Sequence, residues 1–177
     1  MDKELIKIVK SLKGSLLGIG IENENVLDEI NKNDKILTCF LLENNTSKKS
    51  SKLSFSGRRK KANIKKLKKT FGKKRLNYVI CNYEYSKKFM RHFIPGSVAI
   101  NNGKLYLYGK ISEEEVENIK NKYRRYTNDI EIKKIKDEYL ITVNNQNTKN
   151  NFFRDKLFFI EDLGERFMDI LTNLLIN

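Results

Sequence analysis

Two short, almost continuously apolar runs constrain the fold of this sequence more than any other feature. They span residues 15–21 and 36–42, and a third strand-like run follows at 76–81. Such runs are expected where a strand is buried on both faces, as in parallel sheets. The only polar residue of the second run, Thr38, is β-branched and suits a strand. The sequence therefore predicts parallel strands in the interior of the domain.

Helical patterns alternate with these strands. Residues 2–13 repeat their apolar side chains at helical spacing, with Asp2 as the expected N-cap and Gly14 as the expected stop. Ser112 and Glu115 have the spacing of a capping box, which predicts a helix of about 14 residues. Further helices are predicted around residues 26–30, 59–71, 89–93 and 152–176, the last with a break at Gly164.

An antiparallel element is expected after the last parallel strand. Residues 105–108 are predicted as a strand that follows a turn at 101–103. Residues 130–144 alternate in the way of a hairpin, with its turn near Lys136 and Asp137. The full order of elements is typical of an α/β domain with a mostly parallel sheet, a C-terminal antiparallel hairpin and terminal helices.

The length fits one domain, which we expect to cover residues 1–177. An α/β body of residues 1–146 would precede a C-terminal helical segment of residues 147–177. The oligomeric state stays open, because the apolar runs 158–160 and 171–176 suit packing either on the sheet or on a second copy of the chain.

Composition excludes several classes of protein. The hydrophobic fraction of 39% and the aromatic fraction of 10% are too high for a disordered chain. No apolar run approaches the roughly 18–20 residues that span a bilayer, and the first residues lack the apolar core of a signal peptide. Cys39 and Cys81 lie in apolar runs and lack CxxC spacing, and His92 is the only histidine. We therefore expect a reduced, cytoplasmic protein without a metal site.

The charge is concentrated in one segment. Lys and Arg number 36 against 22 Asp and Glu, a net charge of +14, yet no acidic residue occurs between Asn44 and Tyr83. We call residues 48–75 the basic segment. Its cations are Lys48, Lys49, Lys52, Arg58, Arg59, Lys60, Lys61, Lys65, Lys66, Lys68, Lys69, Lys73, Lys74 and Arg75.

Cations this dense repel one another unless a polyanion compensates them. Lysine contacts to phosphates position a nucleic-acid backbone without reading bases, so the segment predicts sequence-independent nucleic-acid binding. A solvated face in a lysine-rich sequence and an anionic membrane surface are the alternatives.

Three strand ends carry the residue types of a known cofactor site. Leu17-Gly18-Ile19-Gly20 closes the first strand, Glu43 follows the second, and Asn82 and Tyr83 follow the third. Over roughly residues 1–146 this layout resembles the class I S-adenosylmethionine-dependent methyltransferases, which have a Rossmann-like fold. The resemblance implies that S-adenosylmethionine is the cofactor, held by Gly18, Gly20 and, through its ribose, by Glu43. It also implies that Asn82 and Tyr83 line the target pocket as catalytic residues.

Each of these residues also has a plainer interpretation. The two glycines could serve only a tight turn, and Glu43 could be a solvated loop acid. Asn82 could satisfy backbone groups at the strand end, and Tyr83 could anchor a helix. Two functions therefore follow from the sequence: a methyltransferase acting on RNA or DNA, or a non-catalytic module that binds nucleic acid or an acidic partner.

Overall fold

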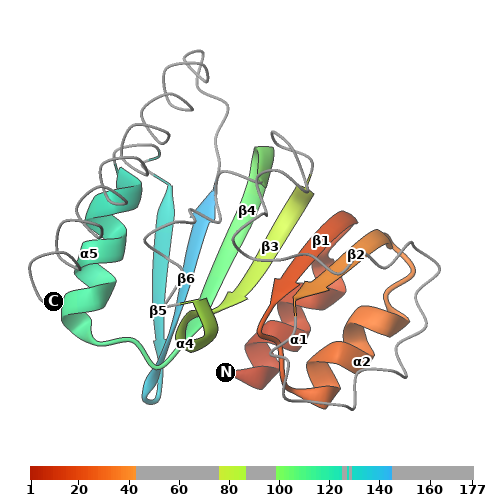
Figure 1. Cartoon of the computed structure of the whole chain (residues 1–177), viewed down its shortest axis with the longest axis horizontal. Helices are drawn as coiled ribbons and strands as arrows, with labels where there is room; N and C mark the ends of the chain where they lie inside the picture. The colour runs from red at the N-terminus through yellow and green to blue at the C-terminus, as the bar shows by residue number, and fades with distance from the viewer. Residues whose placement is uncertain (43–75, 87–98, 125–126, 128, 145–177) are drawn as a thin grey trace, which may run out of the picture.

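The computed structural model describes residues 1–42, 76–86, 99–124, 127 and 129–144. Figure 1 shows their arrangement, in which helices lie beside one sheet. The elements are α1 (Asp2–Ser11), β1 (Gly14–Ile19), α2 (Glu24–Lys32), β2 (Ile36–Leu42), β3 (Leu76–Asn82), α4 (Tyr83–Ser86), β4 (Ala99–Gly109), α5 (Glu113–Arg124), β5 (Ile130–Ile135) and β6 (Glu138–Asn144).

The six described strands form one sheet in the order β2-β1-β3-β4-β6-β5. The first four strands in this order are mutually parallel, whereas β6 runs antiparallel to both β4 and β5. The predicted α/β class with a mostly parallel sheet and an antiparallel hairpin is therefore confirmed. The hairpin turns at Lys136 and Asp137, as the sequence predicted.

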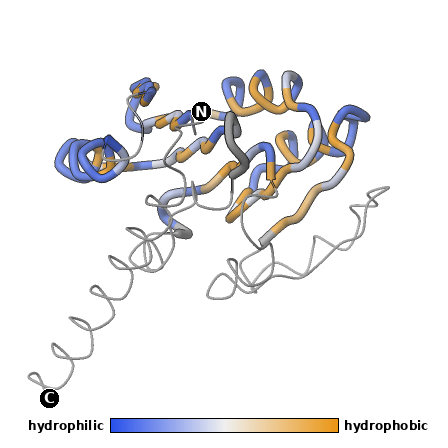
Figure 2. Tube along the Cα trace, turned by 90° about the horizontal axis from the view of Figure 1, so that it is seen from above, coloured by the Kyte–Doolittle hydropathy of each residue, from blue (hydrophilic) through white to orange (hydrophobic). Residues whose placement is uncertain are grey.

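Two layers of apolar side chains cover the two faces of the sheet. On one face, Leu16, Ile80 and Tyr106 pack with the buried sides of α1 and α2. On the other face, Leu107 and Ile141 pack with the buried side of α5. Along the helices, hydrophobic residues alternate with hydrophilic ones in Figure 2, as expected for helices that lie on a sheet. Among the described helices, none has both the length and the apolar character that a membrane crossing requires.

The N-terminal helix differs from its predicted boundaries. Asp2 is its first residue and Met1 is the N-cap, which makes no side-chain capping hydrogen bond. The helix ends at Ser11, and Gly14 begins β1 instead of ending the helix. Gly14 has φ of 97° and donates its N–H to the carbonyl of Lys35 at 2.8 Å, so its glycine conformation serves the start of the strand.

The predicted turn at residues 101–103 is instead part of β4. Leu76 of β3 pairs with Ala99, and Tyr78 pairs with Lys104. Between these two pairs, β4 advances by five residues while β3 advances by two. This register shift allows the Asn-Asn-Gly sequence, which favours a turn, to lie within one long strand. The predicted helices around 59–71, 89–93 and 152–176 lie outside the described residues.

Candidate functional site at the carboxyl edge of the sheet

The four parallel strands end at the same edge of the sheet, which we call the carboxyl edge and where α4 lies (Figure 1). Gly20 follows β1 there, and Asn82 ends β3. From β1 the chain passes through α2 to β2 on one side, whereas β3 lies on the other side of β1. Ligands of open α/β sheets bind outside the strand ends at such a switch point. The space beside Gly20 and Asn82 is therefore the candidate ligand site.

The two glycines of the first strand have different roles. Gly20 lies in the turn with φ of 63°, a left-handed conformation that favours glycine. Gly18 lies inside β1, where a Cβ atom would come within 2.7 Å of both Ile21 Cδ1 and Leu41 Cδ2. The space beside Gly18 is therefore filled by the protein's own side chains, and only Gly20 belongs to the turn.

The start of α2 is closed by its own cap. The Asn23 side-chain oxygen accepts hydrogen bonds from the N–H groups of Asn25 at 2.9 Å and Val26 at 3.2 Å. Ile21 is buried and packs in the same core cluster as Val26. Two of the amides that a helix end can offer to an anion are therefore already used.

Asn82 and Tyr83 connect the end of β3 to its surroundings. The Asn82 side-chain oxygen accepts the N–H of Glu84 at 3.0 Å, which orders the short helix α4. Burial raises the pKa of Tyr83 to about 12, and the adjacent Glu115 carboxylate adds to the shift through its charge and a hydrogen bond. Tyr83 is thus a buried tyrosine whose hydroxyl meets the first turn of α5.

The structure adds Tyr108 to this site, a residue that the sequence pattern identifies only as part of a strand. Its hydroxyl donates to the carbonyl oxygen of Gly20 at 3.3 Å. Burial raises the pKa of Tyr108 above its usual value, although a hydrogen bond with the Asn82 side chain opposes that shift. Tyr108 therefore contacts both the turn after β1, at Gly20, and the end of β3, at Asn82.

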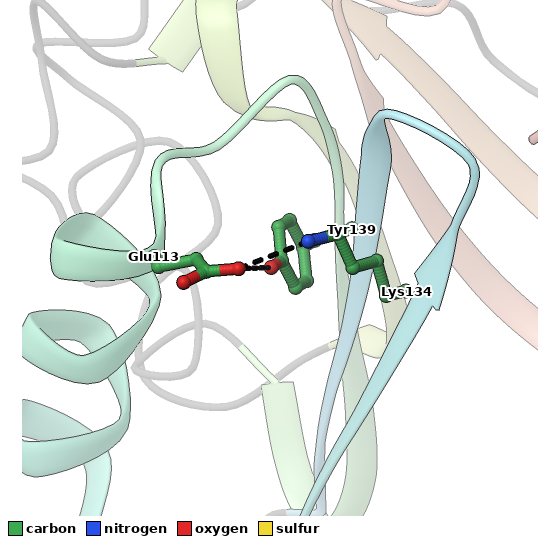
Figure 3. A network of polar contacts seen from close by, with 3 residues as sticks. All are labelled: Glu113, Lys134 and Tyr139. Atoms are coloured by element: carbon green, nitrogen blue, oxygen red, sulfur yellow. Dashed lines mark hydrogen bonds and ion pairs between the residues drawn. The ribbon is translucent and has the colours of Figure 1, made fainter.

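The start of α5 is fastened at the same edge. Ser112 and Glu115 form the predicted capping box, in which the Glu115 N–H donates to Ser112 Oγ at 3.2 Å and Glu115 accepts from the Ser112 N–H at 3.2 Å. Glu113 accepts hydrogen bonds from Lys134 Nζ at 2.9 Å and from the Tyr139 hydroxyl at 3.2 Å (Figure 3). Lys134 Nζ also lies 5.3 Å from the centre of the Tyr139 ring. These contacts join α5 to the hairpin.

Several predicted site residues lie outside the described residues. They are Glu43 and all the cations of the basic segment, from Lys48 to Arg75. The described residues themselves contain 14 Lys and Arg against 16 Asp and Glu. The basic excess of the whole chain therefore belongs entirely to the remaining residues. Within the described part of the chain, no three His, Cys, Asp or Glu side chains gather as a metal site.

S-adenosylmethionine, the cofactor that the sequence resemblance implies, would have to contact mainly the main chain of the carboxyl edge. The left-handed turn at Gly20 lets a ligand approach the main chain closely. By contrast, the space beside Gly18 is filled, and the Asn25 and Val26 amides are capped by Asn23. The main chain of the Gly20 turn is therefore the part of this edge best suited to a close ligand contact, and cofactor binding by Gly18, Gly20 and Glu43 stays a prediction.

Comparisons with known proteins agree with the topology. Neither a protein-family model nor a curated protein matches the chain. An O-methyltransferase family protein from Burkholderia thailandensis superposes with a TM-score of 0.60 at 9% identity, over 84% of this chain and 57% of that one. A precorrin-6y C5,15-methyltransferase from Geobacter metallireducens gives 0.59 at 13% identity, over 81% and 88%.

A tRNA methyltransferase, TrmI from Aquifex aeolicus, gives a TM-score of 0.57 at 12% identity, over 82% of this chain and 69% of that one. The chain thus spans a little over half the length of the first of these neighbours and more of the others. At such identities the likeness concerns the fold. Together with the strand order, it shows that this chain has the Rossmann-like fold of the class I S-adenosylmethionine-dependent methyltransferases.

Proposed function

We propose that this protein binds S-adenosylmethionine at the carboxyl edge and methylates a nucleic acid whose phosphates contact the basic segment. The observation that supports the proposal most is the switch point between β1 and β3, which brings the left-handed Gly20 turn beside Asn82. Solved structures with this fold include S-adenosylmethionine-dependent enzymes. The nucleic-acid part rests on the charge distribution of the sequence.

Each residue of the proposed site has a chemical task. Gly20 would allow close backbone approach, and Glu43, which directly follows β2 in sequence, would accept the two ribose hydroxyls as a carboxylate. Asn82 would orient the target group, while Tyr83 would hold α4 in place through Glu115. Gly18 would contribute only by leaving room for its neighbours. The cofactor supplies an activated methyl group, so the protein's contribution is proximity and orientation.

The basic segment would supply affinity without sequence preference. The segment contains 14 cations and no acidic residue. The described residues, by contrast, carry slightly more acidic than basic side chains. If about six phosphates are neutralised, affinity should fall on the order of a thousandfold between roughly 50 and 200 mM salt. A weak dependence on salt would contradict a phosphate-contacting surface.

Transfer of a labelled methyl group from S-adenosylmethionine to RNA and to DNA tests the enzyme. The proposal predicts incorporation that is lost in an Asn82→Ala variant. Calorimetry of cofactor binding separates the two halves of the proposal, since binding without transfer would refute only the reaction.

A charge-reversal variant tests the nucleic-acid surface. It replaces four cations of the basic segment by Glu: Lys65, Lys66, Lys68 and Lys69. The matched control reverses four exposed cations of the described body: Lys7, Lys13, Lys35 and Lys110. Both variants change the net charge equally, so only a surface located in the basic segment predicts loss of RNA or DNA binding in the first variant alone.

A second candidate is a non-catalytic binding module on the same scaffold. The filled space beside Gly18 and the capped start of α2 favour it, because both reduce what the edge offers a cofactor. This module would bind nucleic acid, or an acidic protein partner, with full affinity in the absence of S-adenosylmethionine. A calorimetric titration that shows no cofactor binding, together with salt-dependent nucleic-acid binding, would favour this candidate over the enzyme.

A further inference from the structure

Tyr108 reaches across the end of one strand to contact the turn of another. It belongs to β4, and β3 lies between β4 and β1 in the sheet. Asn82 is the residue of β3 that pairs with Tyr108, and Cys81 pairs with Ile19, directly before Gly20. The Tyr108 side chain is only 8% exposed, and its hydroxyl lies 3.3 Å from the Gly20 carbonyl oxygen. A side chain of the β3–β4 half thus holds the main chain of the β1 turn.

This contact favours one orientation of the Gly20–Ile21 peptide. Gly20 has access to backbone conformations that other residues avoid, so its own preferences do not select one orientation. The described chain contains no cis peptide bond, and in a trans peptide the C=O and the following N–H point in opposite directions. A hydroxyl that holds the Gly20 carbonyl therefore turns the Ile21 N–H away from Tyr108. A tyrosine hydroxyl is ordinarily protonated near neutral pH, and burial raises the pKa of Tyr108 further, so this hydroxyl can donate.

We infer that Tyr108 is a positioning residue of the carboxyl edge, where it holds the Gly20–Ile21 peptide so that the Ile21 N–H is presented to the acceptor group of a bound ligand. The identity of that ligand as S-adenosylmethionine rests on the proposed function. The orientation of the Gly20–Ile21 peptide does not rest on the proposed function, because it depends only on the hydrogen bond from the Tyr108 hydroxyl to the Gly20 carbonyl.

The chain offers a matched control for this inference. Tyr106 lies two residues earlier on the same strand, packs in the same core cluster and is 7% exposed. Its pKa is raised to about 12 by burial, with Tyr78 and Glu131 adding to the shift, so its hydroxyl has other neighbours. Tyr106→Phe therefore removes an equally buried hydroxyl without removing the contact to Gly20.

The test compares Tyr108→Phe with Tyr106→Phe in two measurements. The carbonyl ¹³C resonance of Gly20 should move in Tyr108→Phe and stay in place in Tyr106→Phe, with no ligand present. Affinity for S-adenosylhomocysteine, measured by calorimetry, should fall about two- to tenfold in Tyr108→Phe, the loss expected for one neutral hydrogen bond. Affinity for RNA should be unchanged in both variants.

The outcomes separate this inference from the proposed function. If the wild-type chain binds no adenosyl compound, the proposed function fails, and the Gly20 resonance still decides whether Tyr108 holds the peptide. An unchanged Gly20 resonance, or equal losses of affinity in the two variants, would overturn the inference. Should Tyr108→Phe fail to fold, the wild-type chain labelled at tyrosine Cζ gives the answer in a mixture of H2O and D2O. If the Tyr108 hydroxyl is hydrogen-bonded, its proton exchanges slowly with solvent and the Tyr108 signal splits into two. A single averaged signal would contradict the hydrogen bond to Gly20.

Discussion

Replacement of Gly18 by alanine tests whether the space beside this glycine belongs to the core or to a ligand. The new Cβ would lie 2.7 Å from Ile21 Cδ1 and 2.7 Å from Leu41 Cδ2. Carbon atoms in contact are normally about 3.5–4.0 Å apart, so both side chains must move. Overpacking of this kind costs about 1–3 kcal/mol, and the reduced freedom of the unfolded chain returns about 0.4–1 kcal/mol. We expect a net loss of about 1–2 kcal/mol in the free energy of unfolding.

Urea denaturation with an unchanged m value measures this loss, and a second substitution identifies its cause. Ile21→Val removes the Cδ1 atom that the new Cβ would meet, at a cost of about 0.5–1.5 kcal/mol by itself. The double variant should then lose less than the two single variants together. If Gly18→Ala is instead stabilising, the space beside Gly18 is open, and our account of the glycine is wrong.

Three further substitutions test other contacts. Lys136→Gly should raise the free energy of unfolding by about 1 kcal/mol, because Lys136 has φ of 56° in the hairpin turn; a loss of stability on urea denaturation would refute this. Asn23→Ala should cost about 1 kcal/mol by removing the cap of α2, whereas Asn25→Ala should cost much less in the same assay. The hydrogen bond from Lys134 lowers the pKa of Glu113, and the hydrogen bond from Tyr139 adds to the shift. The folded-state pKa is the lower one, so this contribution is present above the unfolded-state pKa and is lost as the pH falls through the folded-state pKa. Melting temperatures of Glu113→Gln should therefore decline less steeply in acid than those of the wild type, and parallel declines would contradict the contact.

Local patterns predicted the parallel part of the sheet because its physical cause is local. The runs at 15–21 and 36–42 are apolar on both alternating sets of positions, and the structure buries β1 between β2 and β3. The prediction of full burial was wrong for the second run, because β2 is the edge strand of the described sheet and Leu37 is 73% exposed. The capping box of Ser112 and Glu115 is equally local, since its atoms lie three residues apart. The same reasoning failed at residues 101–103, where pairing with β3 outweighs the turn preference of the sequence.

The contacts that shape the candidate site were beyond prediction because they join distant residues. The Tyr108 hydroxyl meets the carbonyl of a residue 88 positions away, and nothing in the pattern of β4 distinguishes Tyr108 from Tyr106. The sequence pattern groups Gly18 with Gly20, but it does not show that the side chain of Leu41 helps to fill the space beside Gly18. Strand register decides both contacts, and register depends on the whole sheet.

The most direct test of the central claim is a titration of the ¹⁵N-labelled chain with S-adenosylmethionine, followed residue by residue. If the carboxyl edge binds the cofactor, the amide resonances of Gly20, Ile21 and Asn82 should shift together with a single dissociation constant. The amide of Asn77, at the opposite end of β3, should stay in place. No change at Gly20 and Asn82 at saturating cofactor would contradict the account and favour the non-catalytic module.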